Sequence, residues 1–186
     1  MKSFISRHQN FLDKDLIPKI RDYALKNLNT YKWRTSHCWL DHVKRFSSPV
    51  SILEMPDEFT ALIQKKFKDK ISRPMFYLSA AGNYIGWHND ADYEFTATIY
   101  LNEKWNINHG GLFLYSDTKK NTIHGVPPLL NQCIINHGGV PHSISLTTPE
   151  APWRYTLQIF GPRVSETLSR KRQEVFDNWI KQFATK

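Results

Sequence analysis

The sequence predicts a mainly β protein with flanking helices: a sandwich or barrel of short strands, with N-terminal and C-terminal helices packed on one sheet. Short runs rich in β-branched and aromatic residues, separated by turn residues, fill the region 74–162. Apolar residues at helical spacing precede and follow that region. At 186 residues, the chain has the length of one domain with a sizeable core.

The β region divides into several expected strands. These are 75–81, 95–101, 111–115, 129–135, 142–146 and 154–160, with ambiguous short pieces near 85–88 and 122–126. Turn residues such as Gly82-Asn83, Gly110-Gly111 and Gly138-Gly139 separate them. Because no helical pattern alternates with these strands, a sandwich or barrel is favoured over a parallel sheet built from βα units.

Helical patterns on either side complete a single domain. Its expected parts are a helical N-terminal part, 1–70, a β core, 74–162, and a C-terminal helix, 163–184. In the first helix Leu12, Leu16 and Ile20 share one face. A second helix is expected to begin near Pro56. The segment 31–50 has no clear period, and a lid over an enclosed site is one interpretation of it.

Composition narrows the function classes. Apolar residues make up 40% and charged residues 23%, which is typical of a globular protein and not of a disordered one. The net charge of +8 is diffuse, and its densest run, Arg170-Lys171-Arg172, is better explained as an exposed helix face than as a nucleic-acid site. Two cysteines are too few for a disulfide scaffold. With no signal peptide or long apolar span in the sequence, we expect a cytoplasmic protein without a membrane partner.

A candidate metal site begins at His88 and Asp90. In an extended segment, residues two apart project from the same face, so this pair offers one imidazole and one carboxylate to a common point. A later histidine would complete a set of two histidines and one carboxylate, which is diagnostic of non-haem Fe(II) oxygenases. His142 is the leading candidate, and the alternatives are His109, His124 and His137.

The motifs around this pair form a recognisable series. They are Gly82-Asn83-Tyr84-Ile85-Gly86-Trp87-His88-Asn89-Asp90, then Thr98-Ile99-Tyr100-Leu101-Asn102, then Gly110-Gly111-Leu112-Phe113-Leu114, then Pro141-His142-Ser143-Ile144, then Arg154-Tyr155-Thr156. In this order and spacing, the block 82–160 resembles the Fe(II)- and 2-oxoglutarate-dependent dioxygenases, in particular their prolyl-hydroxylase-like branch. The resemblance implies that the β core is a double-stranded β-helix, the jelly-roll or cupin-like arrangement.

The resemblance also implies roles for individual residues. The implied ligands of the iron are His88, Asp90 and His142. Arg154 would hold the distal carboxylate of 2-oxoglutarate, because a planar guanidinium grips a carboxylate through two parallel hydrogen bonds. Further contacts to the same cosubstrate are expected from Tyr100, Thr156 and Tyr77, although Tyr77 is alternatively a plain core residue.

The implied activity couples oxidative decarboxylation of 2-oxoglutarate to hydroxylation of an unactivated C–H bond. Its cofactors would be Fe(II), 2-oxoglutarate and dioxygen, with ascorbate as a candidate co-reductant. We expect the substrate to be a prolyl residue in a protein or peptide. The alternatives are a hydroxylase or desaturase of a free amino acid or other small metabolite and, ranked lower, a nucleic-acid oxygenase or a non-catalytic cupin-like metal binder.

Overall fold

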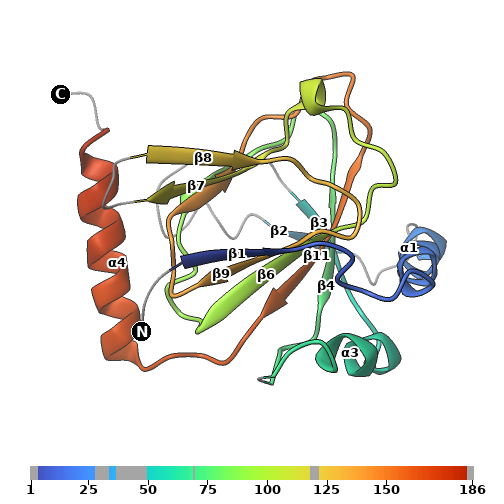
Figure 1. Cartoon of the computed structure of the whole chain (residues 1–186), viewed down its shortest axis with the longest axis horizontal. Helices are drawn as coiled ribbons and strands as arrows, with labels where there is room; N and C mark the ends of the chain where they lie inside the picture. Colours follow the sequence, from blue (N-terminus) through green and yellow to red (C-terminus); the bar gives the residue numbers. More distant parts are fainter. Residues whose placement is uncertain (1–3, 28–33, 37–49, 69, 118–121, 184–186) are drawn as a thin grey trace.

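Strands in the described part of the chain form two antiparallel sheets that face each other (Figure 1). The computed structural model describes residues 4–27, 34–36, 50–68, 70–117 and 122–183. The strands are β1 (Phe4–His8), β2 (Arg34–Ser36), β3 (Val50–Glu54), β4 (Met75–Ser79), β5 (Ile85–His88), β6 (Phe95–Tyr100), β7 (Phe113–Asp117), β8 (Thr122–Val126), β9 (Cys133–His137), β10 (His142–Ile144) and β11 (Arg154–Phe160). The helices are α1 (Leu16–Lys26), α3 (Asp57–Gln64) and α4 (Glu166–Lys181), with a short 3₁₀ turn at Ile107–His109.

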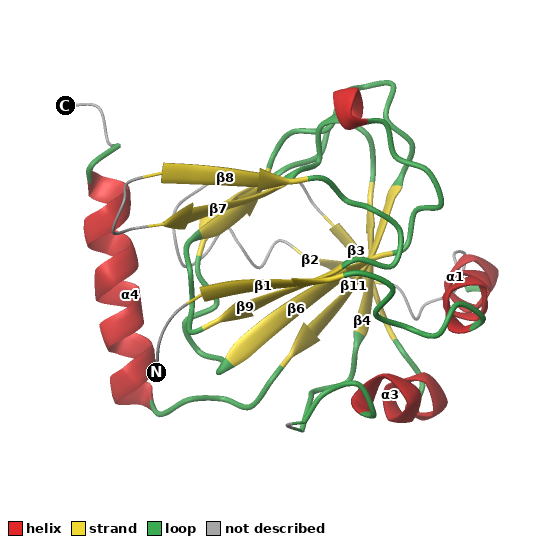
Figure 2. Ribbon diagram, in the orientation of Figure 1, coloured by secondary structure: helices red, strands yellow, loops and turns green. Residues whose placement is uncertain are grey.

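The strand order confirms the predicted jelly roll. The larger sheet has the order β1-β9-β6-β11-β4-β3-β2, and the smaller sheet has the order β5-β10-β7-β8. From β4 to β11 the chain therefore winds back and forth between the two sheets, which is the double-stranded β-helix arrangement. Figure 2 shows the two sheets and the helices outside them.

The larger sheet has an apolar outer face and a more polar inner face, because side chains alternate between the two faces along its strands. In β6, Ala97 and Ile99 join the main apolar core, which also contains residues of α1 and α3. The intervening residues Thr98 and Tyr100 face the smaller sheet, as the period of two residues requires. Burial of the apolar outer face holds α1 and α3 on the sheet. The inner face, which faces the smaller sheet, carries the polar side chains.

A small apolar cluster lies between the two sheets. It is made of buried residues from both sheets: Ile85, Tyr100, Phe113, Val126, Ile134 and Ile144. Elsewhere the inner face carries polar side chains, among them Thr96, Arg154 and Thr156, all buried. Buried polar groups need partners, and this concentration of them marks the interior as the functional part of the fold.

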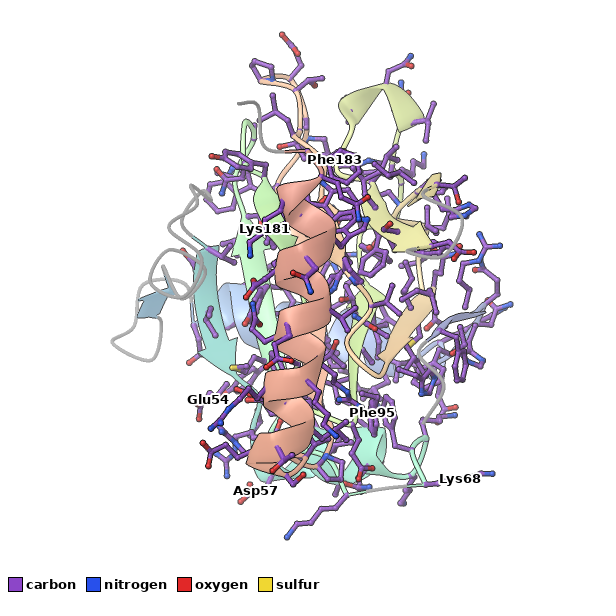
Figure 3. The ribbon with its side chains drawn as sticks, turned by 90° about the vertical axis from the view of Figure 1, so that its left-hand side faces the viewer. Glu54, Asp57, Lys68, Phe95, Lys181 and Phe183 are labelled. Carbon is purple, nitrogen blue, oxygen red and sulfur yellow. The ribbon has the colours of Figure 1, made fainter. Side chains whose placement is uncertain are left out.

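The helices divide between two positions. The sequence predicted N-terminal and C-terminal helices on one sheet, and α1 and α3 do pack on the outer face of the larger sheet. By contrast, α4 lies across strand ends of both sheets (Figures 1 and 3). Its buried residues Phe176 and Trp179 contact each other, and Trp179 packs edge-on against Trp87 of β5, with ring centroids 5.0 Å apart. The contact with Trp87, an outward-facing aromatic of the smaller sheet, thus helps to hold α4 at the strand ends and not on the outer face of the larger sheet.

Among its described residues, the N-terminal part includes strands that its apolar period did not predict. It contributes β1, β2 and β3 as well as helices, because β1 pairs with β9 and β3 pairs with β4, extending the larger sheet on both sides. The expected lid at 31–50 lies mostly outside the described residues. In the described ranges, none of the helices has both the length and the apolar character needed to span a membrane.

Gly110 gives a test of this backbone geometry. It has φ +69°, and a Cβ there would overlap the carbonyl oxygen of Leu146. We expect Gly110→Ala to lower the free energy of unfolding by roughly 2–4 kcal/mol, because left-handed strain and a steric clash add together. Gly82 has φ +75°, and a Cβ there would meet no atom within 4 Å, so its substitution introduces backbone strain without a clash. We therefore expect Gly82→Ala to lower the free energy of unfolding by about 1 kcal/mol. Urea denaturation measures both, and equal losses would contradict the predicted clash.

Candidate metal centre and cosubstrate site

The pairing of β5 with β10 places two histidines opposite each other. His142 pairs with His88, and Ile144 pairs with Ile85, so β5 has one more residue in this stretch than β10. This irregularity acts as a β-bulge, which re-aims the side chains on the longer strand. As a result, Ile85 and His88 are both buried towards the interior although they are three residues apart, and Trp87 is turned towards α4.

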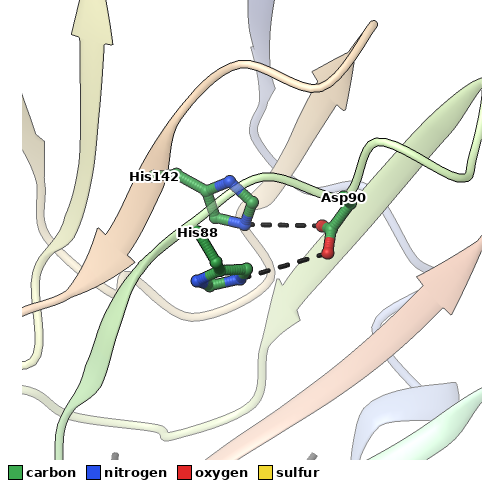
Figure 4. A group of neighbouring side chains, drawn as sticks. All are labelled: His88, Asp90 and His142. Atoms are coloured by element: carbon green, nitrogen blue, oxygen red, sulfur yellow. Dashed lines mark ion pairs between the residues drawn. The ribbon is translucent and has the colours of Figure 1, made fainter. Parts of the chain in front are cut away.

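Asp90 completes a compact group with the two histidines (Figure 4). Its Oδ2 lies 3.4 Å from His142 Nε2, and its Oδ1 lies 4.0 Å from His88 Nε2. One ligand atom of each residue lies within 4.8 Å of the other two. Ligands of one metal ion at right angles lie roughly 3 Å apart, so a small movement would bring the three onto a single ion. Two imidazoles and a carboxylate are the donor set that suits non-haem Fe(II) with open positions.

Both imidazoles are oriented by backbone carbonyls. His88 Nδ1 donates to Gly86 O at 2.7 Å, and His142 Nδ1 donates to Val140 O at 2.9 Å. With the proton held on Nδ1, each Nε2 keeps its lone pair for a metal. Asn136 anchors the second carbonyl, because its side chain donates to Val140 O and accepts from Val140 N.

The carboxylate of Asp90 is held by a hydroxyl of the larger sheet. Thr96 Oγ1, at the inner face of β6, donates to Asp90 Oδ2 at 2.6 Å. This bond connects the two sheets at the candidate metal centre, because Asp90 follows a strand of the smaller sheet. It leaves the other oxygen, Oδ1, on the side of His88.

The other candidate histidines lie elsewhere. His109 is in the 3₁₀ turn beside Trp105, and His124 stacks on Tyr115. His137, on β9, stacks on Phe4 and contacts Ser6 Oγ. Burial lowers the pKa of His137, and the nearby His8 lowers it further. None of the three joins the group of possible metal ligands among the described residues, so the structure brings together the leading set.

Arg154 and Tyr100 form a second polar centre on the inner face. Both are buried, and the guanidinium carbon of Arg154 lies 5.1 Å from the centre of the Tyr100 ring. Among the described residues, Arg154 Nε, Arg154 Nη2 and Tyr100 Oη have no hydrogen-bond partner. Burial raises the pKa of Tyr100, and the positive charge of Arg154 partly opposes that rise. The phenol therefore stays protonated at neutral pH and can donate a hydrogen bond.

These unpaired donors fit a carboxylate ligand. A buried guanidinium without a counter-charge is strongly unfavourable, and unpaired buried polar groups in proteins usually mark a missing partner. One carboxylate could accept from two nitrogens of Arg154 and from Tyr100 Oη. The donor set of the metal group and this carboxylate-binding pair therefore match iron and the distal end of 2-oxoglutarate.

The side chain of Arg154 is confined by the Gly110-Gly111 turn. A Cβ on Gly111, which has φ +67°, would lie 3.1 Å from Trp105 Cζ2, 3.0 Å from Thr147 Cγ2 and 3.6 Å from Arg154 Cδ. Trp105 Nε1 donates to Gly110 O at 2.9 Å, which fixes the turn. The paired glycines in the sequence were the signal for this close approach, and Trp105 is the anchor of the loop.

Thr156 and Tyr77 lie on the same face as Tyr100. Thr156 pairs with Tyr100 on β6 and with Tyr77 on β4. Tyr77 packs with Val50 and Ile52 in a small buried cluster. Their contacts to a cosubstrate stay predictions. Between this row and Thr96 lies a pair that the motifs did not indicate: Thr98 Oγ1 donates to Gln158 Oε1 at 2.6 Å.

The fold resembles that of solved structures, although no sequence match is found. No family model matches the chain, and no curated protein matches its sequence. A prolyl hydroxylase from Trichoplax adhaerens, in complex with a peptide fragment of the hypoxia inducible factor oxygen degradation domain, matches with a TM-score of 0.71 and 14% identity over 92% of this chain and 86% of that one. A prolyl-4-hydroxylase from Pseudomonas putida matches with a TM-score of 0.65 and 18% identity over 88% and 95%. The epimerase SnoN, in complex with Fe3+, alpha ketoglutarate and nogalamycin RO, matches with a TM-score of 0.58 and 12% identity over 86% and 79%. The resemblance predicted from the motifs is confirmed in the fold.

Thr96 offers a test of how the carboxylate is held. Thr96→Val keeps the shape of the side chain and removes the hydrogen bond to Asp90. We expect the affinity for Mn(II), measured by calorimetry, to fall by about 10-fold or more, as is usual when the partner of a metal ligand is lost. Thr96→Ser should restore it. Thr98→Val, two residues along the same face, should leave Mn(II) affinity unchanged, and equal losses at both positions would contradict a specific role of Thr96.

Proposed function

We propose that this protein is an Fe(II)- and 2-oxoglutarate-dependent oxygenase. The observation that carries the proposal is the group of His88, Asp90 and His142, whose ligand atoms lie within 4.8 Å of one another on the interior side of the jelly roll. The buried guanidinium of Arg154 supports it, because Nε and Nη2 have no partner among the described residues and could bind the distal carboxylate of 2-oxoglutarate. The fold shared with prolyl hydroxylases is a third, independent support.

The residues of the chain have separate tasks in this proposal. Iron, when bound with 2-oxoglutarate, supplies the oxidising chemistry with dioxygen. His88, Asp90 and His142 hold the metal through two imidazole nitrogens and a carboxylate oxygen. Arg154 and Tyr100 bind the distal carboxylate and thereby orient the keto-acid end towards the metal group. The apolar cluster between the sheets keeps water from the interior.

For the substrate, we propose a prolyl residue in a protein or peptide, which the enzyme hydroxylates. Both prolyl hydroxylases named above share the fold, and the one from Trichoplax adhaerens was solved with a peptide. A small metabolite is the second candidate, because SnoN has the same fold and was solved with nogalamycin RO. The diffuse distribution of the positive charge gives no support to a nucleic-acid substrate.

Product formation tests the proposed activity. With Fe(II), 2-oxoglutarate, ascorbate and dioxygen, the protein should release succinate, and a library of proline-containing peptides should yield products heavier by one oxygen atom in mass spectrometry. His88→Ala should remove both signals, since it deletes a metal ligand. His109→Ala, outside the metal group, is the matched control and should retain them.

The outcomes separate the class from the substrate. Succinate release without any modified peptide would support the oxygenase and contradict the prolyl substrate. No succinate from the folded, iron-loaded protein, with or without peptides and metabolites, would contradict the oxygenase itself.

Tyr100→Phe tests the carboxylate-binding pair. The substitution removes one hydroxyl donor and leaves the buried ring in place. Hydrogen bonds to charged groups contribute about 1.5–3 kcal/mol, so the Kd for 2-oxoglutarate, measured by anaerobic calorimetry with Mn(II), should rise by roughly 10-fold or more. Tyr155→Phe is the control, because Tyr155 is on the neighbouring strand and packs against the outer apolar core. An unchanged Kd in Tyr100→Phe would show that another group binds this carboxylate.

A further inference from the structure

The segment that carries Asp90 is held mainly by the C-terminal part of the chain. Residues 89–94 connect β5 to β6, outside both strands. Asp92 O accepts from Val164 N, and Glu94 N donates to Pro162 O. Ser169 Oγ, on α4, donates to Asp92 Oδ1. Polar groups of the loop therefore form hydrogen bonds with the segment that leads into α4 and with the helix itself.

Arg172 makes the most direct of these contacts. Its Nη1 donates to Tyr93 O at 2.6 Å and to Ala91 O at 3.3 Å. Its own carbonyl accepts from Asn89 Nδ2 at 3.2 Å. One residue of α4 thus bonds the chain immediately before and immediately after Asp90.

The same side chain also lies against the approach to His142. A Cβ on Gly139, which has φ +74°, would lie 3.4 Å from Arg172 Cδ and 3.5 Å from Ala91 Cα. The arginine stem, the Asp90 loop and the 138–139 turn are therefore in close contact. That turn is three residues before His142, whose ring is oriented by Val140 O. Beside them, Trp179 of α4 packs on Trp87, the neighbour of His88.

We infer that Arg172 is a positioning residue of the metal centre: it fixes the Asp90 loop against the turn before His142, so that metal affinity depends on α4. The inference rests on the proposed function, because it assigns Arg172 to the metal group of His88, Asp90 and His142. Its physical reason is geometric. A metal site needs its ligands within about 0.5 Å of their bonding positions, and the loop reaches that precision only while its carbonyls are held.

The test compares two arginines of the same helix. Arg172→Met keeps the apolar stem and removes the N–H donors, and Arg170→Met does the same at an exposed residue that pairs with Glu166 at 2.9 Å. We expect the Mn(II) affinity of the apoprotein to fall by about 10-fold in Arg172→Met and to stay unchanged in Arg170→Met. The visible absorption of the Co(II)-loaded protein, which reports ligand geometry, should change in Arg172→Met alone. Arg172→Lys, which restores a charged donor, should recover part of both signals.

The results distinguish this inference from the proposed function. Wild-type protein that binds Mn(II) while Arg172→Met binds it equally tightly would overturn the role of Arg172 and leave the oxygenase proposal standing. Wild-type protein that binds no Mn(II) would overturn both. If Arg172→Met does not fold, the same comparison is made between Arg172→Lys and Arg170→Lys. A lower Mn(II) affinity in Arg172→Lys alone supports the inference, and equal Mn(II) affinities in the two variants overturn it.

Discussion

The cross-strand pair of His88 and His142 is the constraint on which the rest of the site depends. Antiparallel pairing of β5 and β10 sets these two imidazoles side by side, and the extra residue in β5 turns His88 inward. Without that bulge, the alternation of the strand would point His88 and Ile85 to opposite faces. The same irregularity turns Trp87 outward, where it meets α4. One local defect in pairing thus creates the metal group and the contact for the helix that supports it.

The larger sheet provides the polar part of the site. Unlike in an ordinary sandwich, its main apolar core lies on its outer face and its inner face carries polar side chains. Its outer face carries the main apolar core with α1 and α3, so its inner face can hold Thr96, Tyr100 and Arg154 without loss of the core. These polar groups are stable in the interior only when they have partners. Thr96 has Asp90 as its partner, whereas Nε and Nη2 of Arg154 and the hydroxyl of Tyr100 have no hydrogen-bond partner among the described residues. That difference separates the polar groups that other side chains satisfy from those that the proposed 2-oxoglutarate would satisfy.

The sequence predicted the elements that local patterns encode. The strand at 154–160 was predicted with its observed bounds, because apolar and polar residues alternate along it. The strands β1 and β3 were missed, since they are short and depend on pairing with β9 and β4. The pair of His88 and Asp90 followed from spacing, and the choice of His142 over the other histidines followed from the resemblance of the motifs to a known family. Thr96, Asn136 and Arg172 did not, because their importance lies in contacts that only the folded chain creates; Arg172 O is 83 residues from its partner Asn89. No local pattern carries such a contact.

A crystal structure of the protein with Mn(II) and 2-oxoglutarate, grown without oxygen, tests the central claim most directly. The account predicts one metal ion bound by His88 Nε2, a carboxylate oxygen of Asp90 and His142 Nε2, with the distal carboxylate of 2-oxoglutarate on Arg154 and Tyr100. A metal bound at other side chains, or 2-oxoglutarate bound away from Arg154, would contradict it.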